Sequence, residues 1–463
     1  MTATTQDVRK VRPFRQRVAL GLAFAAAVPA LVLRVTDGHV SEPLEALAYG
    51  LAIVGAAFLL SWAAEVAQLD ISAGLAIAVL AFIAVLPEYA IDMVFAFKAG
   101  NAVEAYGPAC QAPNVTGPTD CSLALANMTG ANRLLIGVGW SMVVLIAWWR
   151  VRRIGRTAPS AVNGPARPVP DRSEVRLERS HAVDVAFLAL ATLYGLTLPL
   201  KHSITLVDAV VLVAIFVAYT WRISRSPAET PHLVGPARYL GGLGQGARRA
   251  WVVGLFVVAA ATILLCAEHF AEALVATGRD LGISEFLLVQ WLAPLASEAP
   301  ELLVAALYAW RLNTNAGLGT LVSSKVNQWT LLVGTLPVVF AIGVGGLHGL
   351  PIDPHQREEL FLTASQSFFA LAVLATLSIT TREALLLFGL FWAQFVIGAV
   401  VPNSYGGREL IVVGAVYLAL GAWTFFRERD LIPPLVRDGF KAPYAQLAAK
   451  ERREGVDVAD GPS

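Results

Sequence analysis

Long apolar runs alternate with short polar segments along almost the whole chain. Because a transmembrane helix needs about 20 mostly apolar residues, this pattern predicts about twelve spanning helices in an all-α polytopic membrane protein. The runs lie at roughly 18–36, 44–67, 71–98, 122–149, 182–200, 204–221, 249–276, 283–310, 317–346, 358–379, 382–401 and 409–426.

Two of these runs, one in each half of the chain, contain a Pro-Glu dipeptide, Pro87-Glu88 and Pro300-Glu301. A carboxylate at that depth is costly, and proline frees a backbone carbonyl that lipid cannot satisfy. Interrupted apolar segments in corresponding halves are typical of the substrate site of a transporter. The alternative is a pair of kinked structural helices whose glutamates pair inside the protein.

The composition supports a membrane protein. Of the 463 residues, 56% are hydrophobic and 15% are charged, whereas soluble domains carry about 25% charged residues. The net charge of +1 gives no reason to expect nucleic acid as a partner. We expect the lipid bilayer and small inorganic cations as partners, with no cofactor beyond the transported ions; the sequence leaves the oligomeric state open.

Basic residues are unevenly distributed among the short loops, and this sets the orientation. With the N-terminus inside, the inner loops hold most of the arginines, so we expect both termini on the cytoplasmic side of the plasma membrane. The basic N-terminus resembles a signal peptide but lacks a convincing cleavage site, and we interpret it as leading into a retained first helix. The inner loops contain Arg150, Arg152, Arg153, Arg156, Arg222, Arg225, Arg248, Arg249, Arg427 and Arg429.

These features divide the chain into five parts. We expect a cytoplasmic N-terminal segment (1–17), a first transmembrane half (18–221), a flexible cytoplasmic linker (222–248), a second transmembrane half (249–426) and a cytoplasmic tail (427–463) that could include a short surface helix. Under this topology 99–121 is an outer loop. Its Cys110 and Cys121 would lie in an oxidising compartment, which favours a disulfide over two free thiols.

The Pro-Glu segments could bind a hard cation. Glu88 and Asp92 are four residues apart and Glu298 and Glu301 are three apart, so each pair can share a helix face. Carboxylates inside a bundle suit calcium, sodium or protons. The alternative for Asp92 is a solvated position at the outer mouth. Arg133 would need a carboxylate partner if it lies deep in the membrane.

Two pairs of motifs resemble the sodium/calcium exchanger superfamily of cation antiporters. Its Gly-Thr-Ser-Leu-Pro-Glu motif corresponds to Ile-Ala-Val-Leu-Pro-Glu at 83–88 and to Ala-Ser-Glu-Ala-Pro-Glu at 296–301. Its Gly-Asn-x-x-Gly-Ser-Asn-x-x-Asn motif corresponds to residues 126–135 and 319–328. The resemblance implies two inverted repeats, with the ligand site at the bilayer midplane between them.

The resemblance also implies site residues. By position, Glu88 and Glu301 would face each other and bind the cation, and Ser297, Ser324 and Gln328 would complete the site. The shared helix faces described above add Asp92 and Glu298 around it.

Several positions depart from the family pattern. Ala84 and Val85 replace hydroxyls, Leu135 replaces an amide, and Glu298 stands where the family has serine. Lys325 stands where the family has asparagine, and we interpret it as a tethered cation that modulates the charge of the site. The alternative is that Lys325 reaches the cytoplasmic mouth.

The resemblance predicts a secondary antiporter that moves Ca²⁺ or Na⁺ against Na⁺ or H⁺ by alternating access. A Na⁺/H⁺ antiporter without calcium transport and a non-transporting protein that keeps the fold are the alternatives. We do not expect an enzyme, because the sequence has neither a His-Glu-x-x-His nor a Gly-x-Ser-x-Gly motif.

Overall fold

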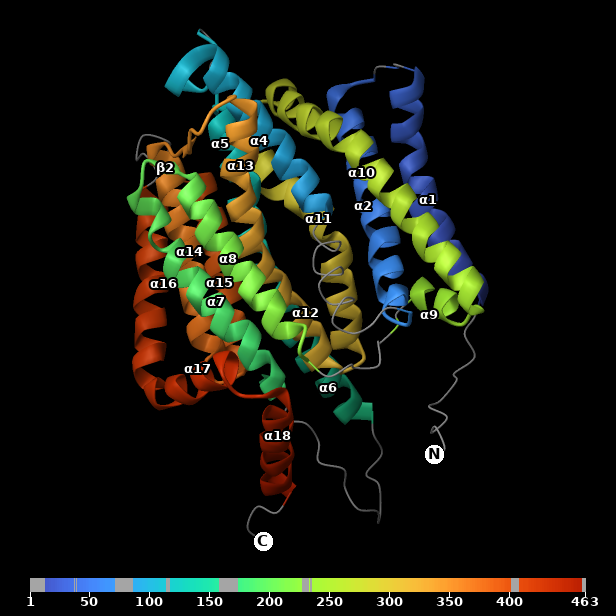
Figure 1. The fold of residues 1–463 in the computed structure, drawn as a ribbon, viewed down its shortest axis with the longest axis vertical. Coiled ribbons are helices and arrows are strands. Elements are labelled where there is room, and N and C mark those ends of the chain that lie inside the picture. The colour runs from blue at the N-terminus through green and yellow to red at the C-terminus, as the bar shows by residue number, and fades with distance from the viewer. Residues whose placement is uncertain are drawn as a thin grey trace. The chain divides into compact units, whose positions relative to one another are not determined.

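The structure is a computed structural model of the 463-residue chain, and helices dominate it (Figure 1). Among the described residues, nine helices are long and apolar enough to cross a membrane. Helices α14 and α15 occupy two of the remaining three predicted runs, and α4 occupies the described part of the third. The described residues are 13–36, 38, 40–70, 86–113, 117–157, 174–226, 233, 235–400 and 408–459.

The chain forms two compact units, and each draws on both halves of the sequence. The first comprises Met1–Val94, Ser226–Leu288 and Ala296–Pro300, and the second comprises Phe95–Arg225, Val289–Leu295 and Glu301–Ser463. Helices α4 (Leu86–Tyr106) and α11 (Glu285–Trp310) contribute residues to both units. A division that takes pieces from both halves is the expected consequence of two interlocked repeats.

The first unit is built around α2, which packs against both α1 and α10 (Figure 1). Gly50 of α2 approaches Phe270 of α10, and Gly55 lies against the backbone of α1 at Ala23. Small residues at such contacts let helices pack closely in a membrane. The helices of this unit are α1 (Pro13–Thr36), α2 (Glu42–Ala67), α9 (Pro236–Gly241) and α10 (Gln245–Leu281).

The second unit has α14 at its centre, with α5, α7 and α16 packed against it. Gly414 and Gly421 of α16 lie one above the other and receive Phe361 and Phe368 of α14. Its other helices are α5 (Asp120–Leu134), α6 (Ser141–Thr157), α7 (Ala182–Gly195), α8 (Leu206–Ile223), α12 (Thr314–Asn327), α13 (Val333–Gly343), α14 (Pro354–Leu374), α15 (Thr381–Val400), α16 (Arg408–Arg427), α17 (Ile432–Phe440) and α18 (Tyr444–Ala459).

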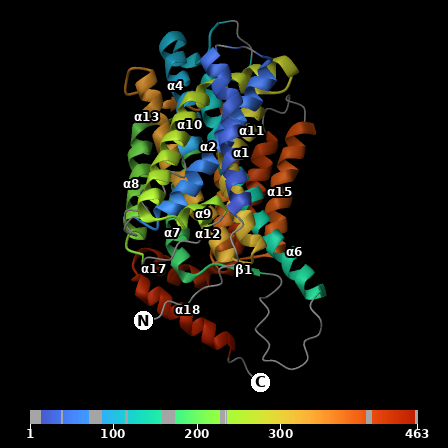
Figure 2. The same ribbon diagram turned by 90° about the vertical axis from the view of Figure 1, so that its right-hand side faces the viewer.

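Two short antiparallel ladders join loops at opposite ends of this unit. Strand β1 (Glu174–Arg176) pairs with β4 (Ser378–Thr380) in the register Val175↔Ile379. Strand β2 (Ser203–Ile204) pairs with β3 (Leu350–Pro351) in the register Ile204↔Leu350. The β1 ladder lies at the end that also holds α17 and α18 (Figure 2), whereas β2 lies at the other end (Figure 1).

Three segments predicted as a loop, a flexible linker and a tail contain helices. The outer loop predicted to begin at residue 99 is helical to Tyr106, because Ala99 and Ala102 are buried and Gly100 packs closely against α13. The linker predicted to be flexible contains α9, which packs on α1 and α2. The tail forms two helices, and Asp438 of α17 is bound by Lys450 of α18 at 2.5 and 2.6 Å. Local propensity alone does not reveal these packing partners.

Candidate functional site

A hydrogen bond joins the two motif helices of the second repeat. Ser324 of α12 donates its hydroxyl to a carboxylate oxygen of Glu301 on α11 at 2.7 Å. A typical intramolecular hydrogen bond contributes about 0.5–1.5 kcal/mol net. This contact orients the Glu301 carboxylate toward the motif of α12.

Lys325 is fully buried and binds the corresponding motif of the first repeat. Its ammonium lies 2.6 Å from the side-chain oxygen of Asn132 and 2.9 Å from the backbone oxygen of the same residue. The ammonium also lies 4.9 Å from the ring centre of Trp329. Since none of its surface is exposed, this geometry does not fit a lysine that reaches out to water.

Both motif helices widen into a π-helical segment where the motif ends. In the first repeat the segment is Leu135–Trp140, and in the second it is Gln328–Leu332. Leu135 and Gln328 are the last positions of the two motif copies, so the irregularity recurs at the same place in each repeat. Such segments release backbone groups from the regular helical pattern and are frequent at functional sites.

Gly130 of the first motif allows α11 to approach α5 closely. A Cβ atom at this position would collide with the backbone oxygen of Gln290. The Gln290 side chain in turn donates to the hydroxyl of Thr129 at 3.5 Å. A glycine is therefore required here for close packing between the two helices.

Arg133 forms a buried ion pair with Glu359 of α14. Its guanidinium nitrogen lies 2.6 Å from the carboxylate, and the two side chains are 1% and 5% exposed. The guanidinium also stacks over Trp291, 4.9 Å from the ring centre. Sequence reasoning required a carboxylate for a deeply placed Arg133, but no local signal identified Glu359 as the partner.

The remaining predicted site residues lie in the first unit. Glu88 and Asp92 are buried on α4, and Ser297 and Glu298 are buried on α11. Ala84 and Val85, the departures in the first motif, lie outside the described residues. The convergence of Glu88 and Glu301 on one cation stays a prediction.

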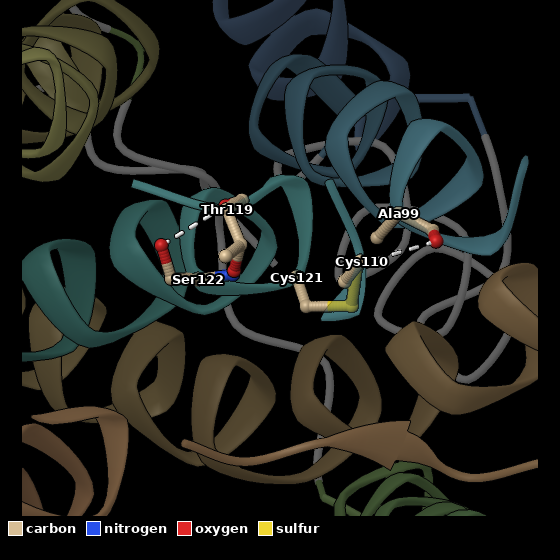
Figure 3. The surroundings of a disulfide bond; sticks show 5 residues. All are labelled: Ala99, Cys110, Thr119, Cys121 and Ser122. Atoms are coloured by element: carbon tan, nitrogen blue, oxygen red, sulfur yellow. Dashed lines mark hydrogen bonds between the residues drawn. A yellow bond between two sulfur atoms is a disulfide. The ribbon is translucent and has the colours of Figure 1, made fainter. Parts of the chain in front are cut away.

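The structure joins Cys110 and Cys121 by a disulfide, with 5.9 Å between their Cα atoms (Figure 3). The Cys110 sulfur lies 3.5 Å from the Ala99 carbonyl oxygen; because a disulfide sulfur carries no hydrogen, this is a contact and not a donated bond. Thr119 caps the first turn of α5 by accepting from the backbone N–H of Ser122. The bridge thus fastens the end of α4 to the start of the first motif helix.

Aromatic and basic side chains gather at the opposite end of the second unit. Arg150 lies over Trp310, Arg152 over Trp148 and Arg153 over Trp149. Such residues are enriched where a membrane meets water. At the same end, burial raises the pKa of Tyr444 in α18 to about 12, so this hydroxyl stays neutral at physiological pH.

Comparison with known proteins identifies the family. The sequence matches the model of the sodium/calcium exchanger protein family over residues 44–224 and 251–399. The chain in the crystal structure of the H⁺/Ca²⁺ exchanger CAX is 38% identical; the match covers 95% of this chain and 100% of that one, with a TM-score of 0.80. Native YfkE is 12% identical over 87% of this chain and 100% of its own, with a TM-score of 0.53, which supports the fold alone. No curated protein sequence matches the chain. The chain belongs to the sodium/calcium exchanger family of membrane cation antiporters.

Proposed function

We propose that this protein exchanges calcium for protons across the cell membrane. The observation that carries the proposal is the Lys325 ammonium, which is held inside the protein by two oxygens of Asn132. The 38% identity to an H⁺/Ca²⁺ exchanger supports the same choice of ions. Alternating access would arise from one group of helices that slides or rocks against the core formed by the repeats.

The charge of Lys325 argues against a site that holds several sodium ions. In the family pattern this position is an amide, which supplies an oxygen to a cation. Here the Lys325 ammonium takes the place of that oxygen donor, so a positive charge stands one residue after Ser324. Since like charges repel strongly in a medium of low dielectric constant, the site should hold fewer mobile cations. Calcium balanced by protons on the carboxylates meets that condition.

We assign the ligands as Glu88 and Glu301, with Ser297, Ser324 and Gln328 completing the site and Asp92 and Glu298 around it. Carboxylate, hydroxyl and amide oxygens are the donors that calcium prefers. The contact between Ser324 and Glu301 supports the part of this set that lies in the second unit. Protons would occupy the carboxylates when calcium leaves.

We place both termini on the cytoplasmic side. The arginines that lie over Trp148, Trp149 and Trp310 support this orientation, because basic residues concentrate on the inner side of a membrane. The disulfide at the other end would then face the oxidising outer compartment.

Transport by the purified protein in liposomes tests the proposal. We expect calcium uptake driven by a pH gradient, and no comparable flux with sodium or potassium. Glu88→Gln and Glu301→Gln should abolish uptake. Glu272→Gln should retain it, because this carboxylate of α10 is about half exposed and lies outside the proposed ligand set. Sodium/proton exchange without calcium flux would favour the first alternative, and no flux with any cation would favour a non-transporting protein.

A further inference from the structure

Two carboxylates outside the proposed cation site bind its motif helices from the opposite repeat. Asp184 of α7 follows the first repeat's motif in sequence but contacts α12 of the second repeat. Glu359 of α14 follows the second repeat's motif but contacts α5 of the first. Each contact lies within the second unit, and neither residue belongs to the ligand set proposed above.

Asp184 holds α12 at the residue that precedes Ser324. The hydroxyl of Ser323 donates to one carboxylate oxygen of Asp184 at 2.8 Å, and Tyr219 of α8 donates to the same oxygen at 2.5 Å. The other oxygen contacts His181 Nδ1 at 2.8 Å. The His181 ring also lies against Gly319, where a Cβ atom would collide with it. The contacts of Asp184 with Ser323 and of His181 with Gly319 therefore fix the rotation and the depth of α12.

Glu359 makes the corresponding contact in the other repeat. Its partner, Arg133, follows Asn132, the residue that binds Lys325. His355, one turn earlier on α14, lies 3.9 Å from the Glu359 carboxylate and 3.8 Å from that of Glu358. Glu359 is 5% exposed, whereas His355 is 50% exposed. A buried acid and a more exposed histidine thus recur at the start of both helices.

The two clusters lie at opposite ends of the second unit. His181 follows β1 by a few residues, and β1 lies at the end that holds α17 and α18 (Figure 2). His355 follows β3, whose partner β2 lies at the other end (Figure 1). Inverted repeats produce this arrangement, because each feature of one repeat recurs on the other side of the membrane.

We propose that Asp184 and Glu359 are paired positioning residues, each of which sets the geometry of the opposite repeat's motif helix from one face of the membrane. This inference rests on the proposed function, because the proposed function assigns Ser324 to the cation site and gives Lys325 its role there. Neither carboxylate touches the cation. Each acts through one residue: Ser323 precedes the proposed ligand Ser324, and Arg133 follows Asn132, which binds Lys325.

Other titratable groups surround both clusters and belong in the test. Around Asp184 these are His181, Tyr219, Arg222 and Tyr444, the last two stacked 4.7 Å apart. Around Glu359 they are Arg133, His355, Glu358, Glu409 and Tyr417. A histidine is the group among them that ordinarily titrates near neutral pH.

Double-mutant cycles that measure the KM for calcium test the positioning role of Asp184. Asp184→Asn and Ser323→Ala should each raise KM about threefold to tenfold, and the double variant should raise it no further than the larger single effect. Tyr219→Phe is the comparison variant: it removes the other hydrogen bond to the same oxygen and keeps the Ser323 hydroxyl. It should lower the melting temperature and leave KM unchanged. Additive effects, or a KM shift in Tyr219→Phe equal to that of Ser323→Ala, would overturn the proposal.

Two variants test the role of Glu359: Glu359→Asp shortens the side chain, and Glu359→Gln makes it neutral. Glu359→Asp should raise KM with less loss of stability than Glu359→Gln, which leaves Arg133 uncompensated. The double variant Glu359→Gln/Arg133→Gln should be more stable than either single variant, with KM still raised. An unchanged KM in Glu359→Asp and in the double variant would overturn this role.

The histidines provide a readout that a purely structural role would not move. With pH varied on one side of the vesicle at a time, His181→Gln should flatten the pH dependence of KM from one face and His355→Gln from the other. Effects from the same face would overturn the paired arrangement. Calcium binding is also measured as a rise in melting temperature, which needs no transport. Calcium binding without exchange would refute the proposed function, and the positioning roles of Asp184 and Glu359 could still be tested by binding. A wild type that binds no cation would refute both the proposed function and the positioning roles.

Discussion

Lys325 and Asn132 occupy corresponding positions in the two copies of the second motif, and they bind each other directly at 2.6 Å. They are 193 residues apart in sequence, the same separation that relates Gln328 to Leu135 at the ends of the two motifs. A contact between corresponding residues indicates that they lie near the pseudo-twofold axis relating inverted repeats. The sequence has therefore placed a buried lysine close to that axis.

Lys325→Asn should change the ion stoichiometry of transport. The variant restores the amide of the family pattern and removes the fixed charge, so the site should accept an additional monovalent cation and become less dependent on proton concentration. Calcium flux measured against imposed pH and sodium gradients checks this. Lys325→Met keeps the apolar stem without adding an oxygen ligand, and it should lose flux without gaining sodium coupling. Unchanged selectivity, stoichiometry and pH dependence in Lys325→Asn would show that the lysine is not a substitute cation.

Ser324→Ala should weaken calcium binding. The variant removes the hydroxyl that donates to Glu301 at 2.7 Å and orients its carboxylate, so calcium affinity should fall by about twofold to tenfold, the equivalent of about 0.5–1.5 kcal/mol. Ser367→Ala is the control, because that buried hydroxyl donates only to the backbone of its own helix, at Thr363. Calcium titrations of the purified proteins measure the difference. Equal affinities in the two variants would contradict a role for Ser324 in the site.

Much of the fold was predictable from the sequence, because its cause is local. Every predicted apolar run corresponds to a helix over its described residues, and the runs require no knowledge of tertiary contacts. The Pro-Glu dipeptides and the repeated second motif likewise predicted the site helices α4, α5, α11 and α12.

What the sequence could not supply are pairings between distant residues. Asn132 carries no sign that it binds a lysine, and Glu359 is one of several acids near the start of α14. The π-helical segments have no marked sequence signature either, since Leu135–Trp140 and Gln328–Leu332 differ in composition. Such features depend on which helices meet, and tertiary packing decides that.

Acid should destabilise the first unit through Asp70. Two bonds of 2.7 Å from Arg248 hold the pKa of the Asp70 carboxyl down to about 2 from its ordinary 3.8. The folded chain thus binds fewer protons than the unfolded chain between these values, so stability rises with pH there. The contribution is complete above about pH 4 and disappears as pH falls through about 2.

Melting temperatures recorded from pH 5 to pH 2 test this expectation. The wild type should lose stability more steeply across that window than Asp70→Asn, which cannot titrate. The two proteins should converge at the acid end, where the wild-type carboxyl is protonated. Parallel curves over the whole range would mean that the contact between Asp70 and Arg248 does not contribute to stability.

Gly100→Ala should destabilise the protein by forcing α4 away from α13. An ideal Cβ at this position would lie 2.5 Å from the backbone oxygen of Phe340 and 2.8 Å from the Cα of Gly343, and neither backbone atom can move aside by rotating a side chain. Overpacking of this kind costs about 1–3 kcal/mol. Gly254→Ala on α10 is the matched control, because no atom of the described residues lies within 4 Å of the added methyl group. The control should be neutral or more stable by up to about 1 kcal/mol, since alanine has the higher helix propensity. Thermal unfolding in one detergent compares the two substitutions, and equal melting temperatures would show that α4 and α13 do not approach each other at Gly100.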